Sequence, residues 1–251
     1  MAKGRLRRRT ILFEPRTYRA KVSDTDLVSF VVREKESDLL IRAKSNLARK
    51  AAKLLSKYRK QIEAYIARHP EFASTLEPLS EDPNAPEIVR QMLRAGILTG
   101  VGPMAGIAGA IAERVGMELT EFSPDVIVEN GGDVFLKVTK PRRVAIEAGS
   151  SPLSGKVGIE IHPGESPCGV CTSSGTHGHS LSLGCADAAT VVAKDTALAD
   201  AAATALGNKI NNPKDLKKAV TEISEISGLT GCLAIRGDKL AIAGKIHICD
   251  I

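Results

Sequence analysis

Hydrophobic and polar positions divide the chain into strands and helices in an irregular order. Near the start, β-branched and aromatic residues predict three strands of an antiparallel meander, at residues 11–22, 27–34 and 37–43. Residues 46–69 then carry an apolar stripe at helical spacing, with basic residues on the opposite face. We expect Ser45 to cap this helix and Pro70 to end it.

The middle of the chain predicts two further helices and a hairpin. Residues 85–97 are amphipathic, and residues 99–116 form a Gly-rich entry into a small-residue helix that we expect Gly116 to end. Residues 124–138 predict two strands joined by Asn-Gly-Gly-Asp, because a Gly-Gly pair between apolar runs is a hairpin signal.

The remaining pattern predicts the fold class. We expect residues 142–148 and 156–162 to continue the sheet, residues 213–226 to form a helix, and residues 231–250 to close the chain as a hairpin. Meanders mixed with helices, instead of alternating βαβ units, predict an α+β fold. We assign residues 10–251 to a single compact domain and residues 1–9 to a basic tail.

Composition narrows the class of protein. Hydrophobic residues are 43% and charged residues 25% of the chain, an ordinary balance for a soluble globular protein. No apolar run approaches the ~18 to 20 residues of a membrane span, and the N-terminal stretch has no apolar signal-peptide core. We therefore expect a cytoplasmic protein with no membrane partner. Five cysteines, an odd number, argue against a secreted disulfide scaffold.

The net charge of +6 is concentrated in two places, the first residues and the basic face of the helix at residues 46–69. Aromatic residues are only 3% and Trp is absent, which argues against a single-strand binder that stacks bases on aromatic platforms. We do not expect a nucleic-acid partner.

The densest chemistry lies at residues 168–206, which begin with a Cys-x-x-Cys pair, Cys168 and Cys171. A redox pair would start a helix, and the residues that follow Cys171 do not have a helical pattern. A zinc site would need further ligands, for which His177, His179 or Cys185 are available. A reactive thiol and simple packed cysteines stay open beside these two interpretations.

The same segment ends in a helix on which Asp200 and Thr204 stand four residues apart. That spacing puts both side chains on one face. An acid and a hydroxyl on an Ala/Leu surface are typical of a site for a hard cation. The alternative is a solvated aspartate beside a merely tolerated threonine.

Two polar turns offer ligand contacts. The first is Asn130, Gly131, Gly132 and Asp133, where glycines allow close backbone approach. The second is Thr172, Ser173, Ser174 and Gly175, whose hydroxyls and N–H groups suit a phosphate or carboxylate. Each is also explained, and more simply, as a plain turn. P-loop, GxSxG and HExxH motifs are absent from the sequence.

These stretches occur together in one known family. They are GIAGAIAERVG at residues 106–116, NGGD at 130–133, VCTSSG at 170–175, His179, and LADAAATAL at 198–206. On them the chain resembles the ApbE-like family of FAD:protein FMN transferases, and most closely a compact branch of ApbE-related proteins in archaea and bacteria.

The resemblance implies an ApbE-like α+β fold and a Mg²⁺ ion held by Asp200, Thr204 and the backbone carbonyl of Gly106. It also implies that residues 130–133 and 172–175 line a pocket for FAD or another nucleotide. We select Cys171, His179 and Asp187 as candidate catalytic residues. The implied partners are a small-molecule nucleotide or flavin and a protein substrate, and a homodimer is a candidate assembly.

Two parts of the family pattern are absent here, the lysine of its GIAKG motif and its DPRTG stretch. Two alternatives to flavin transfer therefore stay open. One is thiol-dependent sulfur handling in homocysteine formation, to which the resemblance also extends. The other is a non-catalytic protein that binds a small molecule.

Overall fold

The computed structural model describes residues 26–175 and 184–251. The expected tail at residues 1–9, the expected strand at residues 11–22, and the candidates His177 and His179 lie outside the described residues. Within them the chain forms five α-helices and eleven strands, all paired antiparallel. The predicted α+β class is confirmed.

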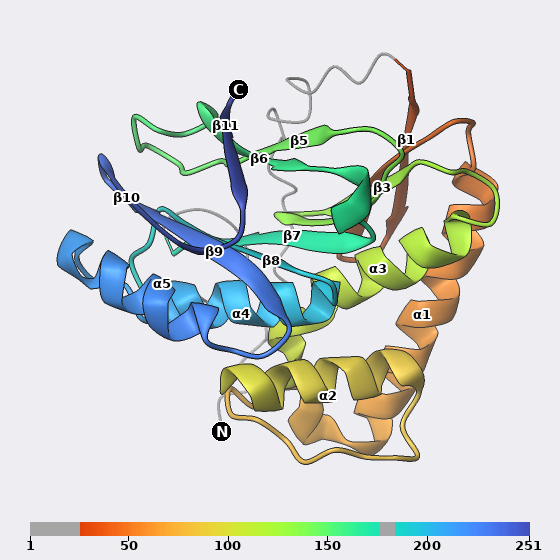
Figure 1. The fold of residues 1–251 in the computed structure, drawn as a ribbon. Coiled ribbons are helices and arrows are strands. Elements are labelled where there is room, and N and C mark those ends of the chain that lie inside the picture. The colour runs from red at the N-terminus through yellow and green to blue at the C-terminus, as the bar shows by residue number, and fades with distance from the viewer. Residues whose placement is uncertain (1–25, 176–183) are drawn as a thin grey trace, which may run out of the picture.

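A large sheet of eight strands runs through the centre of the molecule (Figure 1). Its strands, in spatial order, are β1 (Val28–Glu34), β2 (Ser37–Ala43), β3 (Val126–Asn130), β4 (Asp133–Lys137), β7 (Cys168–Ser173), β8 (Ala188–Ala193), β9 (Leu229–Arg236) and β10 (Lys239–Gly244).

The helices lie on one face of this sheet (Figure 1). They are α1 (Ala48–Arg68), α2 (Glu87–Thr99), α3 (Ile107–Leu119), α4 (Thr196–Asn208) and α5 (Leu216–Ser224), with short 3-10 turns η2 (Pro70–Ala73), η3 (Pro103–Gly106), η4 (Pro163–Glu165) and η5 (Pro213–Asp215). The core between helices and sheet is the larger of two hydrophobic cores, and we call it the helix-side core.

A small sheet covers part of the opposite face. Its strands are β5 (Arg142–Ala145), β6 (Val157–Ile161) and β11 (His247–Asp250), with β6 in the middle. Apolar residues such as Ile159 and Ile161 pack against the large sheet in a second core. The prediction that residues 142–148 and 156–162 continue the first sheet is therefore wrong, because alternation marks a strand but does not say which sheet it joins.

The terminal hairpin is confirmed only in its first half. β9 and β10 pair across the turn at Gly237 as expected. The chain then leaves the sheet at Gly244, whose φ of 84° lies in the left-handed region, and β11 crosses to the small sheet. β11 therefore connects the C-terminal end of the chain to the second layer.

The first helix follows the predicted stripe. Ala51, Leu55 and Tyr58 are buried against the sheet, and the helix ends at Arg68, just before Pro70. Its start differs from the prediction, because the side chain of Asn46, and not Ser45, accepts a hydrogen bond from the Ala48 N–H, at 3.0 Å.

Gly116 does not end α3, which runs on to Leu119. A Cβ at this position would lie 2.2 Å from Cδ1 of Phe135 on β4. The glycine is needed because the helix packs directly on that ring, so its role is close approach and not termination.

Among the described residues, no single helix is long and apolar enough to cross a membrane. Helices α2 and η3–α3 reach the required length and composition only together, and the two are bent by 112° at the break between them.

Candidate functional site

One row of side chains across three strands forms the base of the candidate site. Asn130 on β3 pairs with Asp133 on β4, and Asp133 pairs in turn with Cys171 on β7. Alternate residues of a strand face the same way, so Asp133 shares the face of Phe135, which lies in the helix-side core. Asn130, Asp133 and Cys171 therefore all point toward the helices.

The Gly-Gly turn brings this row together. Gly131 has a φ of 77°, which a two-residue hairpin turn requires, and the predicted hairpin is confirmed. The Gly132 carbonyl accepts a hydrogen bond from the Thr172 N–H at 3.0 Å. A Cβ on Gly132 would lie 2.4 Å from the Thr172 oxygen, so only glycine lets the turn approach β7 this closely.

Helices α3 and α4 close the site from above. The Asp200 Oδ2 on α4 accepts a hydrogen bond from the Gly109 N–H in the first turn of α3, at 2.9 Å. The Asn130 amide donates to the neighbouring Ala108 carbonyl at 3.2 Å. A Cβ on Gly109 would lie 2.3 Å from the Thr196 carbonyl oxygen, so the two helices cross at close backbone distance.

The position of α4 is set at its first turn. Asp195 is its N-cap, and the Asp195 Oδ1 accepts from the Leu198 N–H at 2.9 Å. Glu113 on α3 accepts from the Thr196 N–H at 2.6 Å. The helix itself is rich in alanine, which has high helix propensity and little side-chain volume, so α4 can pack between the sheet and α3. Asp200 is thereby held at a fixed height above the sheet.

Two buried carboxyl groups meet in this space. Asp133 and Asp200 are each 8% exposed, and their side chains are hydrogen bonded to each other. Burial raises the pKa of Asp133 to about 7, and the nearby Glu129 carboxylate adds to this. Burial and the charge of Asp133 raise the pKa of Asp200 well above its usual range. Such a pair requires a shared proton or a bound cation.

The donor set fits a hard divalent cation. Mg²⁺ and Ca²⁺ take oxygen ligands from carboxylates, carbonyls and hydroxyls, and the site offers two carboxylates with no basic side chain paired to either among the described residues. Thr204 lies one turn beyond Asp200 on α4 and is half-buried. Gly106 is buried at the entry to α3, where a Cβ would lie 2.8 Å from the Ala197 carbonyl of α4.

The segment at residues 172–175 is not the turn that we expected. Thr172 and Ser173 belong to β7, and their side chains face opposite ways. The Thr172 hydroxyl is hydrogen bonded to the Thr190 hydroxyl at 2.9 Å, on the face of the sheet that points away from the helices. Ser173 shares the face of Cys171, and its buried Oγ has no hydrogen-bond partner among the described atoms. Only Ser174 and Gly175 follow the strand, and the Gly175 N–H donates to the Ala186 carbonyl at 2.9 Å.

The Cys-x-x-Cys pair is divided between the two faces of β7. Cys168 lies in the core beneath the small sheet, whereas Cys171 lies in the helix-side core. Residues three apart on a strand point in opposite directions, so these two sulfurs do not share a metal ion or a disulfide. Burial raises the pKa of Cys168 to about 12. Burial and the neighbouring Asp133 and Asp200 raise the pKa of Cys171 well above its usual range.

Asp187 has structural partners of its own. Its Oδ1 accepts from Arg236 at 3.0 Å, and its Oδ2 accepts from the Gly237 N–H at 2.6 Å. It therefore fastens the turn between β9 and β10.

The sequence singled out both Asp133 and Asp200, but it did not indicate that they meet. The available signal was the hairpin register, which puts Asp133 opposite Asn130 on the helix-facing side. Gly109, which supplies the N–H at the site, was missed, although it stands three residues after Gly106 at the start of α3.

Comparison with known proteins identifies relatives over most of the chain. A family model described as AbpE bacteria matches residues 19–236. A UPF0280 protein of Methanocella arvoryzae is 46% identical over 189 residues, which are 75% of this chain and 77% of the relative. A UPF0280 protein of Methanothrix thermoacetophila is 46% identical over 191 residues, covering 75% and 79%.

Solved structures share the fold. The apo form of the Pseudomonas stutzeri flavinyl transferase ApbE aligns with a TM-score of 0.56 at 16% identity, covering 86% of this chain and 94% of that chain. The flavin transferase ApbE from Vibrio cholerae aligns with a TM-score of 0.58 at 14% identity, covering 86% and 96%. The expected ApbE-like fold is confirmed.

Proposed function

The chain belongs to the family described as AbpE bacteria, and on this premise we propose that it is a Mg²⁺-dependent flavin nucleotide transferase. The observation that carries the proposal is the buried Asp133–Asp200 pair at the crossing of α3 and α4. A fold alone does not decide chemistry, so the proposal rests on this site and its donor atoms.

The residues that would hold the ion supply oxygen atoms only. They are the Asp200 carboxylate, the Thr204 hydroxyl and the Gly106 carbonyl, with Asp133 as a second carboxylate. When bound, Mg²⁺ would neutralise negative charge on the pyrophosphate of FAD while its phosphoanhydride bond breaks.

The protein's own groups would orient the nucleotide. The Ser173 Oγ is buried and has no hydrogen-bond partner among the described residues, so it is available to a ligand on the helix side of β7. Ser174, Gly175 and the turn at Gly131 and Gly132 are our candidates for the rest of the pocket wall. Asn130 would act indirectly, because its amide holds the Ala108 carbonyl and with it the start of α3.

The proposed transfer moves the FMN half of FAD to a hydroxyl of a protein acceptor. The hydroxyl oxygen bonds to the phosphorus of FMN, the phosphoanhydride bond breaks, and AMP leaves with the bonding electrons. His179 stays our candidate for accepting the hydroxyl proton, because imidazole titrates near neutral pH. The buried, protonated Cys171 is better suited to packing than to nucleophilic attack.

The proposal is tested by isothermal titration calorimetry of FAD with and without Mg²⁺, together with chromatography of released AMP. We expect FAD to bind only when Mg²⁺ is present. Asp200→Asn should weaken this binding at least about tenfold, because losing even an outer-shell partner of a metal site commonly costs that much. Asp238→Asn, which removes an exposed carboxylate, is the control and should bind FAD like the unmodified chain.

Each outcome of this experiment separates one function from another. Binding with AMP release supports transfer or its hydrolytic half-reaction. Binding without AMP release, also in the presence of candidate acceptor proteins, would instead identify a non-catalytic flavin-binding protein. Absence of binding for FAD, FMN, ATP and ADP under all conditions would contradict the proposal.

A further inference from the structure

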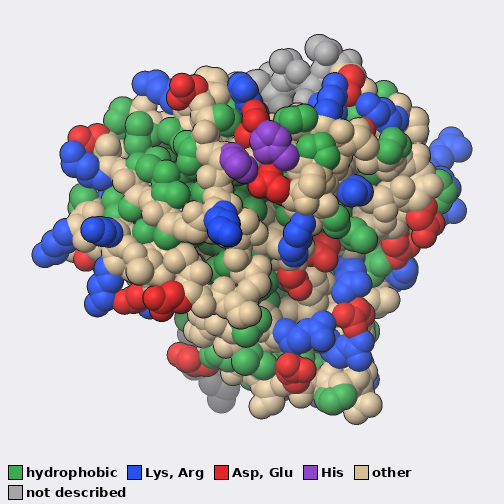
Figure 2. Space-filling view, in the orientation of Figure 1, with side chains coloured by type: hydrophobic (Ala, Val, Ile, Leu, Met, Phe, Trp, Pro, Cys, Tyr) green, Lys and Arg blue, Asp and Glu red, His purple; other side chains and the backbone are tan. Residues whose placement is uncertain are grey.

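A second cluster of metal-ligating side chains lies on the far side of the large sheet from the acid pair. Figure 2 shows two histidines next to each other on the surface, beside acidic side chains. They are His162 and His247, whose rings meet edge to face with centroids 5.1 Å apart, together with Glu165. None of these residues belongs to the proposed flavin site.

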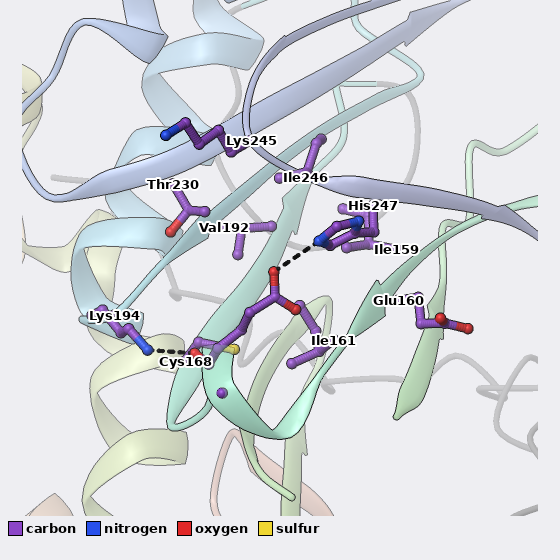
Figure 3. Close-up of a pocket in the computed structure, with 12 residues that line it drawn as sticks. Ile159, Glu160, Ile161, Cys168, Val192, Lys194, Thr230, Lys245, Ile246 and His247 are labelled. Atoms are coloured by element: carbon purple, nitrogen blue, oxygen red, sulfur yellow. Dashed lines mark hydrogen bonds and ion pairs between the residues drawn. The ribbon is translucent and has the colours of Figure 1, made fainter. Parts of the chain in front are cut away.

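The backbone of the small sheet brings the three together. His162 directly follows β6, and η4 turns the chain so that Glu165 comes back beside it. β11 pairs with β6 so that His247 stands opposite Glu160. In Figure 3 the His247 ring points toward the cavity beside Ile159, and a dashed line marks its contact with Glu165.

The donor atoms of the three residues lie close enough together to share one metal ion. One donor atom from each of His162, Glu165 and His247 lies within 4.8 Å of the other two. The His247 Nε2 is 3.2 Å from the Glu165 Oε1. Bonds of about 2.0–2.1 Å to zinc at tetrahedral angles put neighbouring ligand atoms roughly 3.3–3.4 Å apart. An ion therefore fits with small side-chain adjustments.

Hydrogen bonds already hold the carboxylate in place. The Glu165 Oε2 accepts a hydrogen bond from the backbone N–H of His162 at 2.7 Å, which leaves the Glu165 Oε1 directed at His247. The Glu165 carbonyl accepts from Lys194 at 2.6 Å, a bond also drawn in Figure 3. Metal sites are more selective when such contacts fix their ligands before the ion binds.

A candidate for the fourth ligand is Glu160, which lies beside His162 but outside the three-residue cluster. The Glu160 Oε1 lies 3.3 Å from the His162 Nε2. The Glu160 Oε2 accepts a hydrogen bond from the Arg143 Nε at 2.9 Å. Alternatively, water could fill this position, because Glu165 and His247 also line a cavity of about 180 Å³.

We propose that His162, Glu165 and His247 form a binding site for a transition-metal dication of the Zn²⁺ class. Two imidazoles and a carboxylate suit Zn²⁺, Co²⁺, Ni²⁺ or Cu²⁺, whereas Mg²⁺ prefers oxygen ligands alone. The site is thus chemically distinct from the acid pair. By joining β11 to the β6–η4 connection, the ion would fasten the C-terminal strand to the small sheet.

The test is Zn²⁺ titration of the full, untagged chain by calorimetry, with Co²⁺ absorption as a second readout. We expect one equivalent of Zn²⁺ to bind and Co²⁺ to give the intense visible bands of a tetrahedral site. His247→Ala and His162→Ala should each lower the Zn²⁺ affinity at least about tenfold. The His247 side chain is 60% exposed, so its truncation leaves the core intact, and circular dichroism checks this.

Three control variants assign the ligands. His69→Ala removes a surface histidine that stacks on Tyr65 and lies 3.6 Å from Glu71, and it should leave Zn²⁺ binding unchanged. Cys249→Ser removes the thiol two residues from His247 on the same strand and should also leave it unchanged. Asp200→Asn should leave Zn²⁺ binding unchanged as well, so the test of the zinc site does not depend on the proposed flavin chemistry.

Two results would overturn the proposal. One is the lack of any Zn²⁺ binding tighter than about 100 μM. The other is Zn²⁺ binding that persists in both His162→Ala and His247→Ala, because the ligands would then lie elsewhere. If such binding also disappeared in Cys249→Ser, the Cys249 thiol would be one of those ligands.

Discussion

Asp133 and Asp200 destabilise the metal-free protein when they are ionised. Each carboxyl is buried, and no cation among the described side chains is paired with either. Taking a carboxylate out of water is unfavourable unless it is paired, and here the second charge is of the same sign. A binding site that is poorly stable without its ligand is the expected consequence.

Asp200→Asn should therefore stabilise the metal-free chain at neutral pH. The amide keeps an acceptor for the Gly109 N–H and gains a donor toward Asp133. We expect a gain of about 1–2 kcal/mol, which for a chain of this length raises the melting temperature by roughly 2–8 °C. Calorimetric melting with EDTA measures this. Adding Mg²⁺ should raise the melting temperature of the unmodified chain only, and an equal rise in the variant would contradict the assignment.

The same pair predicts an unusual dependence of stability on pH. The pKa of Asp133 is raised from 3.8 to about 7, and that of Asp200 is raised as well. Between about pH 4 and pH 7 the folded chain keeps protons that the unfolded chain releases, so this contribution to the free energy of unfolding falls as the pH rises. Below about pH 4 both carboxyls are protonated in the folded and in the unfolded chain, so they no longer lower the free energy of unfolding.

Urea unfolding in EDTA at a series of pH values isolates this contribution. The relevant quantity is the free energy of unfolding of the unmodified chain minus that of the Asp133→Asn/Asp200→Asn double variant, because the other carboxyls cancel. We expect this difference to fall from pH 4 to pH 7. A difference that stays flat or rises over that range would mean that the carboxyls are not buried together.

Residue roles were only partly predictable from the sequence. Asp200 and Thr204 could be placed on one helix face from their spacing, but the meeting of Asp133 with Asp200 depends on tertiary packing between residues far apart in the chain. The residue types at positions 172–175 predict a turn, whereas Thr172 and Ser173 belong to β7. Strand alternation therefore puts their side chains on opposite faces of the sheet.

At the level of elements, the crossing of α3 over α4 decides the site geometry. The two helices approach so closely that the Cβ of an alanine at position 109 would lie 2.3 Å from the Thr196 oxygen and 2.9 Å from the Asp200 Cβ. Helices at this separation cannot accept a methyl group without moving apart.

Gly109→Ala should accordingly lower both stability and ligand binding. We expect a loss of about 1–3 kcal/mol in the free energy of unfolding and a weaker effect of Mg²⁺ on melting, because Asp200 moves with α4. Gly164→Ala is the matched control, since a Cβ there meets no atom within 4 Å. Urea unfolding measures both variants, and equal stability of the two would refute the close crossing.

Elements were predicted best where the signal is local. The stripe of α1 and the Gly-Gly hairpin follow from side-chain spacing and turn chemistry alone. Gly116 was misinterpreted because a glycine near a helix end has two explanations, and only the position of Phe135 decides between them. The second sheet was missed because strand patterns carry no information about partners.

At the scale of the whole molecule, the large sheet separates two cores, and the three buried cysteines are distributed between them. Cys168, Cys171 and Cys232 are buried, Cys249 is partly buried and Cys185 is exposed. Because burial also raises the pKa of all three buried thiols, few thiolates form there at neutral pH.

Alkylation of the native protein tests this layered arrangement. With iodoacetamide at neutral pH, mass mapping should find Cys185 modified first, Cys249 more slowly, and the three buried cysteines only after unfolding. Rapid modification of Cys171 in the native protein would contradict the burial of the site and would favour the sulfur-handling alternative.

The most direct test of the central claim is a crystal structure of the protein soaked with Mg²⁺ and FAD. We expect an ion about 2.0–2.1 Å from a carboxylate oxygen of Asp200, with the nucleotide pyrophosphate beside it. We also expect that the same soak of Asp200→Asn crystals shows neither. An ion and nucleotide bound away from α3 and α4, or FAD bound at the acid pair without any metal, would contradict it.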